Sequence, residues 1–426
     1  MEWIIAISLF VLAILGAPLF AVILAAAVCG FYLTGIDLAV IAIELYRIAD
    51  IPLLIALPLF TFAGYILSES NTSHRVVDLS RALFGWIPDE LAIVTLVSCA
   101  LFTAFTGATG VTIVALGALL LPALREAGYG EKYSTGLVTT SGSLGLLLPP
   151  SLPLILYVII VQQMDIGEAI QMEDAFKAGI LPSLLMIALL VIWSRWATRH
   201  SRVDKQKFSG RRLVLAFYTA RWELPLPFIL LGGIYGGYFA VSEAAAVTAL
   251  YALIIEVFIY KEVRLKKLPD IIRESMLVVG GILLILAASL ALTNFIIDAE
   301  IPSRLFDWIR DHISSKLVFL IVLNLFLLVL GAFLDIFSAL VLMVPLILPL
   351  ALGYGIHPLH LGIIFLANMQ VGYFTPPVGM NLFIASYRFE KPISEIYAST
   401  IPFMLVLLLA VLIITYWPAL SLAFIK

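Results

Sequence analysis

Two segments of the sequence place a pair of prolines beside side chains whose oxygen atoms could hold an ion. The polar neighbours of Pro149-Pro150 are Thr140, Ser141 and Ser143, and those of Pro376-Pro377 are Asn368, Thr375 and Asn381. A proline has no N–H and its ring clashes with the preceding turn, so a helix breaks there and leaves carbonyl oxygens without partners. Neutral oxygens of this kind suit a hard cation such as sodium. The half-helix that starts after each pair points its positive end at the break, which favours an anionic substrate.

The same polar residues could instead only pack helices together, because Ser and Thr bond between membrane helices without any ligand. Duplication of the pattern argues against packing alone. At one constant offset, Pro122 falls on Pro349, Gly128 on Gly355, Ser141 on Asn368, Gly145 on Gly372 and Pro149-Pro150 on Pro376-Pro377. Glycine and proline mark constrained backbone geometry, so both copies are predicted to share one geometry. We expect an inverted repeat, with the binding site at the interrupted helices.

Two apolar runs are too long for one crossing, which needs about 20 residues. The run 91–124 is interrupted by Thr106-Gly107-Ala108-Thr109-Gly110, and the run 316–352 is interrupted at Gly331, with Asp335 and Ser338 just beyond. Each run is predicted to form a helical hairpin that precedes a broken helix. An intramembrane carboxylate is a functional candidate. Asp335 could therefore either cap the hairpin turn or face a sodium or proton path.

Composition sets the class of protein. Of 426 residues, 62% are hydrophobic and 12% are charged, and the mean hydropathy is +1.11, whereas soluble domains carry about 25% charged residues. Continuous apolar runs predict an all-α integral membrane protein rather than a β-barrel, whose strands alternate. A net charge of −3 offers no basic surface for nucleic acid. The sequence shows no P-loop, no catalytic constellation and only two cysteines, so we expect no enzyme and no disulfide framework.

The apolar runs predict about 10 to 13 crossings of the membrane. They cover 3–34, 51–68, 91–124, 133–163, 176–197, 222–260, 275–298, 316–352, 360–387 and 396–424. The first run is interpreted as a retained helix, because it lacks the basic start of a signal peptide. Lysine and arginine are concentrated in 195–221 and 261–273, which should therefore be cytoplasmic, with an even number of crossings between them.

Several segments of the sequence resemble one known family. They are SGSLGLLLPPSLPLILY (141–157), ANMQVGYFTPPVGMNLF (367–383), GAFLDIFSALVLMVPLILPL (331–350), GIHPLHLG (355–362) and GGIYGGYFAVSEAAAV (232–247). The first two are similar to the signature segments of the large membrane subunit of TRAP transporters, the tripartite ATP-independent periplasmic transporters. The similarity extends over nearly the whole chain.

This resemblance implies an elevator-type fold in a bacterial cytoplasmic (inner) membrane, with a scaffold and a mobile transport domain that carries both hairpins. It also implies two partners: a small four-helix membrane subunit on a separate polypeptide, and a soluble periplasmic binding protein. The binding protein would deliver an organic acid such as a dicarboxylate, sialic acid or a sugar acid, and sodium (Na+) would drive transport. A stand-alone sodium- or proton-coupled anion transporter of a related elevator fold is the alternative that the duplicated hairpins leave open.

The expected sites combine the two breaks with the positions that match the family. The first cation site is expected at Thr106, Gly107, Ser141, Ser143 and Gly145, and the second at Gly331, Asp335, Ser338, Asn368, Gly372 and Thr375. The substrate is expected near Thr109, Pro149, Pro150, Ser151, Pro376, Pro377 and Asn381. The first hairpin tip, Thr106-Gly107-Ala108-Thr109, departs from the serine-rich tips that are more common in the family. This departure leaves the side-chain ligands of the first hairpin open.

The predicted organisation divides the chain into six segments. They are N-terminal scaffold helices (1–90), the first transport-domain repeat (91–163), scaffold helices with the basic cytoplasmic segments (164–274), a scaffold helix with a connecting segment (275–315), the second transport-domain repeat (316–390) and a C-terminal helix (391–426).

Overall fold

A computed structural model describes residues 8–9, 11–12, 17–48, 51–84, 90–164, 170–199, 209–313 and 315–425. All regular secondary structure within these ranges is helical. Nine helices of the described chain are long and apolar enough to cross a membrane, and four shorter apolar helices accompany them. The prediction of an all-α membrane protein is therefore confirmed. The first part of the predicted run 3–34 falls largely outside the described residues, and its second half is α2 (Leu19–Thr34).

The predicted repeat is present as two copies of one succession of helices: a spanning helix, a linker helix, a hairpin and a broken helix. The first copy consists of α4 (Ala56–Glu69), α5 (Thr72–Phe84), α6 (Glu90–Thr106), α7 (Thr109–Glu126), α8 (Glu131–Ser141) and α9 (Leu152–Gln163). The second consists of α14 (Leu268–Asp298), α15 (Ile301–His312), α16 (Lys316–Phe333), α17 (Ile336–Gly353), α18 (Pro358–Gly372) and α19 (Met380–Phe389). Hairpin 1 is α6–α7 and hairpin 2 is α16–α17.

The other helices of the described chain pack around these two copies. They are α2, α3 (Ala39–Arg47), α10 (Met172–Thr198), α11 (Gly210–Thr219), α12 (Pro225–Tyr235), α13 (Val241–Leu253), α20 (Ile393–Tyr416) and α21 (Ala419–Leu422). A π-helical turn, Ile254–Ile259, continues α13. Helices α12 and α13 pack on each other between the two basic segments, and the even number of crossings expected there stays a prediction.

The helices break where the proline pairs predict. In the first copy, α8 ends at Ser141, a short 3-10 turn covers Leu144–Leu147, and α9 begins just after Pro149-Pro150. In the second copy, α18 ends at Gly372 and α19 begins just after Pro376-Pro377. Both proline pairs contain a cis peptide bond. The missing N–H groups prevent a continuous hydrogen-bond ladder through either break.

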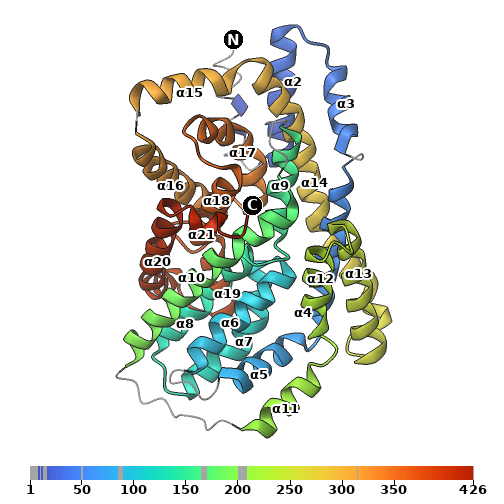
Figure 1. Ribbon diagram of the computed structural model, residues 1–426, viewed down its shortest axis with the longest axis vertical. Helices are drawn as coiled ribbons and strands as arrows, with labels where there is room; N and C mark the ends of the chain where they lie inside the picture. Colours follow the sequence, from blue (N-terminus) through green and yellow to red (C-terminus); the bar gives the residue numbers. More distant parts are fainter. Residues whose placement is uncertain are drawn as a thin grey trace.

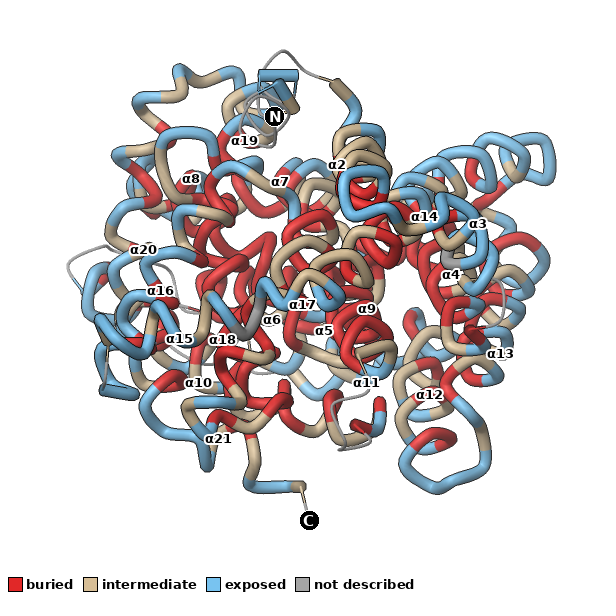
Figure 2. The backbone as a smooth tube through the Cα atoms, turned by 90° about the horizontal axis from the view of Figure 1, so that it is seen from above, coloured by how far each residue is buried: buried red, intermediate tan, exposed pale blue. Residues whose placement is uncertain are grey.

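Burial separates the molecule into an inner and an outer group of helices. In the most apolar 18-residue window of Glu131–Gln163, 89% of the residues are buried, against 39% in that of Leu265–Asp298. Figure 2 shows the buried stretches in red, gathered around α6, α9, α17 and α18. Helices α12, α13 and α14 instead expose large apolar side chains such as Phe228, Leu250 and Leu284. Exposed apolar side chains on such helices are expected to face lipid.

The linker helices of the two copies lie at opposite ends of the molecule (Figure 1). At one end α5 packs against α6, α7 and α11, and at the other α15 packs against α14 and α17. The two hairpins are therefore reached from opposite ends, as an inverted repeat requires.

A glycine allows α8 and α20 to cross with their backbones in contact. A Cβ atom on Gly136 would lie 2.0 Å from the carbonyl oxygen of Ser399 and 2.7 Å from the Phe403 ring. Backbone atoms cannot rotate away as a side chain can, so an added methyl group has to push the two helices apart.

We expect Gly136→Ala to destabilise the protein by about 1–3 kcal/mol, because overpacking displaces backbone. The matched control is Gly280→Ala on α14, where the new methyl group meets nothing within 4 Å. That control should be neutral or stabilising, since alanine has the higher helix propensity. Thermal unfolding in detergent measures both variants, and equal transition temperatures would contradict the close crossing.

Candidate functional site

Hairpin 1 covers both sides of the first break. Its tip turns at Gly107, whose φ of +66° favours glycine, and a Cβ atom there would lie 2.5 Å from Leu152 Cδ1 at the start of α9. On the other side of the break, a Cβ atom on Gly145 would lie 2.3 Å from Ala100 O and 2.4 Å from Ala104 N of α6. The structure therefore brings the predicted tip residues and Gly145 to the same break.

Two threonines that the sequence analysis missed connect the hairpin to this break. Thr103 Oγ1 donates to the Gly142 carbonyl at 2.8 Å and lies 2.7 Å from Thr112 Oγ1 across the hairpin. Both side chains are fully buried. The signal was present in the sequence, because threonine recurs at every third position through the tip: 103, 106, 109 and 112.

The two predicted serines of the first break donate their hydroxyl hydrogens to carbonyl groups. Ser141 Oγ donates to Val138 O at 3.1 Å, and Ser143 Oγ lies 3.2 Å from Thr140 O and 3.3 Å from Gln370 O. A hydroxyl that donates its hydrogen keeps lone pairs free. Both oxygens could therefore still coordinate a cation, and Ser143 also connects the first copy to α18 of the second.

Hairpin 2 meets the second break through two glycines. A Cβ atom on Gly372 would lie 2.6 Å from the Cα atom of Gly331, so the two backbones are in direct contact. The tip is held from the break as well, because the Ile336 N–H donates to the Tyr373 hydroxyl at 2.8 Å. The structure therefore brings the predicted residues Gly331 and Gly372 together, in the manner of hairpin 1.

Asp335 caps the second helix of hairpin 2. Its Oδ1 accepts the N–H groups of Phe337 and Ser338, both at 3.0 Å, and its Oδ2 accepts the Ser338 hydroxyl. The residue itself is exposed at the tip. Of the two roles considered for Asp335, the structure shows the capping contacts, and they also account for Ser338. Coupling to an ion stays a prediction.

The side-chain hydrogen bonds of Asn368 and Thr375 do not go to the tip residues of hairpin 2. Asn368 Nδ2 donates to Asn324 Oδ1 at 2.6 Å, nearly three turns before the tip in α16, and Thr415 of α20 donates to the same oxygen at 3.2 Å. Thr375 Oγ1 donates to Val371 O at 2.9 Å. Asn368 Oδ1 is buried and has no donor within the described chain. It therefore offers a free neutral oxygen, although not at the tip.

Two uncapped helix N-termini meet where the substrate is expected. Neither α7 nor α19 has a side-chain cap, whereas α9 is capped by Ser151 and α17 by Asp335. Thr109, at the start of α7, donates to Asn381 Oδ1 at 2.8 Å at the start of α19. Asn381 is fully buried, and its Nδ2 has no acceptor in the described chain. Two positive helix ends and a free donor together suit a carboxylate.

The proline pairs themselves offer little to an anion. A cavity of about 180 Å³ lies beside the second break, lined by Thr375, Pro376 and Pro377 and by apolar residues of α16 and α20. Ser151 Oγ is occupied, because it donates to Leu146 O and accepts the Leu154 N–H at 3.2 Å. The prolines thus end and start helices, while Thr109 and Asn381 supply the polar atoms.

The donor atoms around both breaks are neutral oxygens of hydroxyl, amide and carbonyl groups. Among the residues that the structure describes, no group of three or more His, Cys, Asp or Glu side chains could hold a metal ion. Hard monovalent cations accept neutral oxygen ligands, whereas transition metals favour imidazole and thiolate ligands. The arrangement therefore fits sodium better than a transition metal.

Comparison with known proteins identifies close relatives. The family model "Tripartite ATP-independent periplasmic transporter, DctM component" matches residues 6–420. A C4-dicarboxylate TRAP transporter large permease protein of Rhodobacter capsulatus is 33% identical over 403 residues, covering 92% of this chain and 91% of that protein. A 2,3-diketo-L-gulonate TRAP transporter large permease protein of Escherichia coli is 28% identical over 406 residues, covering 95% and 94%. An isethionate TRAP transporter permease protein, DctMQ, of Oleidesulfovibrio alaskensis is 32% identical over 374 residues, but this match covers only 58% of that protein.

A solved structure shares the fold. The YdaH transporter of Alcanivorax borkumensis superimposes with a TM-score of 0.64 over 86% of this chain and 85% of that one, at 15% sequence identity. At this identity the likeness concerns the fold alone.

Asp335→Ala should destabilise the protein by about 1 kcal/mol, because the first N–H groups of α17 lose their acceptor. Asp335→Ser should restore most of that loss, since serine is also a good N-cap residue. Thermal unfolding of both variants beside the unchanged protein measures the difference. Equal losses in the alanine and serine variants would show that the cap does not stabilise hairpin 2.

Proposed function

The chain belongs to the DctM family of tripartite ATP-independent periplasmic transporters, and from this membership we propose that it imports an organic acid anion together with sodium ions by an elevator-type movement. The proposal includes a bacterial inner-membrane location, a small membrane subunit and a soluble periplasmic binding protein that delivers the anion. The observation that carries it is the meeting of two uncapped helix ends, those of α7 in hairpin 1 and of α19 after the second break, at the Thr109–Asn381 contact.

An anionic substrate fits the polar groups at the meeting of α7 and α19. The two helix ends provide N–H groups without side-chain caps, and Asn381 Nδ2 adds a buried donor without an acceptor. A carboxylate would satisfy Asn381 Nδ2, which otherwise stays unpaired at a free-energy cost, and would gain from the positive ends of both helices. The names of three relatives specify C4-dicarboxylates, 2,3-diketo-L-gulonate and isethionate, all of which are organic anions. We therefore propose an organic acid anion as the substrate class.

Sodium would bind where each hairpin meets its break. At the first break Thr103 Oγ1 of hairpin 1 lies 2.8 Å from the Gly142 carbonyl oxygen, and at the second break the Gly331–Gly372 contact places two backbones together. A cation held there would draw hairpin and break together. Because the same hairpin 1 also provides the N-terminus of α7, this closure would complete the site for the anion. Binding of the ion and of the substrate would thereby be coupled.

An elevator-type movement needs a boundary between scaffold and transport domain that can slide. The scaffold is taken as α2–α4 and α12–α14, and the transport domain as the hairpins and broken helices. Gly64 of α4 lies against the tip of hairpin 1, since a Cβ atom there would lie 2.7 Å from the Cα atom of Thr106. Ser289 of α14 donates to Val341 O of hairpin 2 at 2.7 Å. Neither contact involves a charged group. The transport domain could therefore break both contacts and form new ones along the scaffold at a low cost in free energy.

Uptake of labelled organic acids into proteoliposomes tests the proposal directly. Vesicles holding this chain and its small membrane subunit should take up a C4-dicarboxylate or a sugar acid only with an inward sodium gradient and with the binding protein outside. Uptake that needs sodium alone would assign the chain to stand-alone symporters of a related fold. Uptake that ignores sodium but follows a proton gradient would contradict the neutral-oxygen cation sites.

Two variants should separate the cation site from the substrate site. Thr103→Val removes a hydroxyl but keeps the shape, and it should raise the half-saturating sodium concentration several-fold. Asn381→Leu should raise the half-saturating substrate concentration by about ten- to a hundredfold at saturating sodium, because one hydrogen bond to a charged group contributes about 1.5–3 kcal/mol. Uptake titrations in each variant measure both constants. A Thr103→Val protein with unchanged sodium dependence would remove this threonine from the site.

A further inference from the structure

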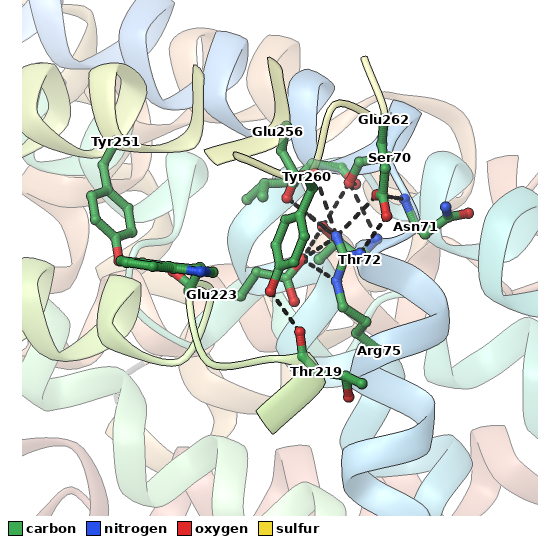
Figure 3. A network of polar contacts seen from close by, with 12 residues as sticks. Ser70, Asn71, Thr72, Arg75, Thr219, Glu223, Tyr251, Glu256, Tyr260 and Glu262 are labelled. Atoms are coloured by element: carbon green, nitrogen blue, oxygen red, sulfur yellow. Dashed lines mark hydrogen bonds and ion pairs between the residues drawn. The ribbon is translucent and has the colours of Figure 1, made fainter. Parts of the chain in front are cut away.

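A buried ion network joins linker helix α5 to the scaffold, away from both candidate sites. Its centre is Arg75, in the first turn of α5, which lies among three glutamates (Figure 3). These belong to separate scaffold segments: Glu223 precedes α12, Glu256 lies in the π-helical turn after α13, and Glu262 lies in the loop toward α14. A short stretch of α5 is thus fixed to three points of the scaffold at once.

Each of the three guanidinium nitrogen atoms of Arg75 contacts a different glutamate. Its Nε donates to Glu223 Oε1 at 2.8 Å, its Nη1 donates to Glu262 Oε1 at 2.6 Å, and its Nη2 lies 3.3 Å from Glu256 Oε2. The Arg75 and Glu223 side chains are 10% exposed, and that of Glu256 is fully buried. The planar fork of an arginine can satisfy several carboxylates in one fixed geometry, which a lysine cannot do.

Thr72 and Tyr260 pack around the Arg75 guanidinium group and its glutamate partners. Thr72 Oγ1 donates to Glu223 Oε1 at 2.6 Å and lies 3.2 Å from Glu256 Oε1. The Tyr260 ring centroid lies 4.0 Å from the guanidinium carbon, and the Tyr260 hydroxyl donates to Thr219 O at 2.6 Å. Figure 3 shows these side chains converging on the guanidinium group from both sides of the α5 terminus. α5 therefore has little room to rotate on the scaffold.

The Arg75–Glu262 pair stays ionised at neutral pH. Burial raises the pKa of Glu262, but hydrogen bonds from Arg75 and from Asn71 lower it further, to below its usual range. Burial likewise lowers the pKa of Arg75, and the hydrogen bonds with Glu223 and Glu262 outweigh it, so the pKa rises. Charge attraction therefore persists over the physiological pH range.

Ion networks of this kind fix geometry more than they add stability. Well-packed apolar residues would stabilise a buried contact as well or better, whereas separating the charges leaves each one buried and unpaired. The network therefore favours one arrangement of α5 on the scaffold and penalises its loss. In the second copy α15 holds the corresponding place, yet within the described chain its charged side chains form no salt bridge. Its contact with hairpin 2 is made by Phe306 against Gly353 and Tyr354.

We propose that Arg75 is a positioning residue that keeps α5 on the scaffold throughout the transport cycle, so that hairpin 1 moves relative to α5 and not together with it. The inference rests on the proposed elevator-type movement. It assigns the four ionisable residues of the network to transport, although none of them lies at the proposed ion or substrate sites. Removal of the network should therefore slow the movement of the loaded transport domain and leave binding intact.

Cross-linking of the assembled transporter tests whether α5 stays in place. In a background of Cys29→Ser and Cys99→Ala, the pair Thr72→Cys and Glu256→Cys replaces two side chains that lie 3.2 Å apart. Cross-linking them with mercuric ion should leave sodium-driven uptake intact. The pair Ser289→Cys and Val341→Cys spans the scaffold and hairpin 2 and should stop uptake when cross-linked, reversibly on addition of thiol.

Arg75→Gln supplies the second measurement. We expect its maximal uptake rate to fall about tenfold, with half-saturating sodium and substrate concentrations unchanged, because only the movement is slowed. Cross-linking the Thr72→Cys, Glu256→Cys pair in the Arg75→Gln protein should restore the rate, and the unchanged half-saturating concentrations exclude a mere loss of folded protein from the binding sites. Asp78→Asn, an exposed carboxylate on the same helix, is the matched control and should leave the rate unchanged.

The outcomes distinguish a failure of this inference about α5 from a failure of the proposed elevator-type movement. If cross-linking Thr72→Cys to Glu256→Cys stops uptake and thiol restores it, α5 has to leave the scaffold and the inference is wrong. A failure of this pair to cross-link, or of the cross-link to rescue Arg75→Gln, overturns it as well. If uptake instead continues with Ser289→Cys cross-linked to Val341→Cys, the elevator-type movement itself is wrong.

Discussion

Backbone N–H and C=O groups that lose their helical partners inside a bilayer find no water to hydrogen-bond with. This constraint governs the arrangement of both repeats. Each proline pair interrupts a helix whose preceding segment, α8 or α18, is largely buried. Each interruption is covered by a hairpin, and both covers depend on glycine. Gly145 lies against the backbone of α6, and Gly372 lies against Gly331 of α16. The hairpins are therefore the means by which two broken helices persist in a membrane at all.

The two copies interlock, so neither break is an independent site. Ser143 of the first break reaches the Gln370 carbonyl of the second copy at 3.3 Å, and Tyr157 of α9 donates to Pro358 O at 2.5 Å. The Thr109–Asn381 contact joins the tip of hairpin 1 to a half-helix that belongs to the second copy. A change at either hairpin thus reaches the helix ends proposed for the substrate. This connection gives a physical route by which ion and substrate binding could depend on each other.

The breaks and hairpins could be predicted because proline and glycine act on the chain within a turn or two of their own position. The Asp335 cap was equally local, since its partners Phe337 and Ser338 follow at once. Contacts between residues far apart in the sequence have no local pattern from which they could be predicted. Asn368 was assigned to the hairpin tip, but its partner is Asn324, and no spacing in the sequence relates the two. Likewise, the glutamates around Arg75 lie in segments that only the fold brings together.

The charges of the described chain are distributed in a way that suits movement of one part against the other. The Arg75 network holds four ionisable side chains at the junction of α5 and the scaffold, whereas the atoms around the breaks are neutral apart from exposed Asp335. Carrying an unpaired charge through the low-dielectric core is costly. In the proposed mechanism the empty site carries none, and an anion alone would introduce one. Sodium ions bound at the breaks would offset that charge, so the domain would cross readily only when both are bound or neither is.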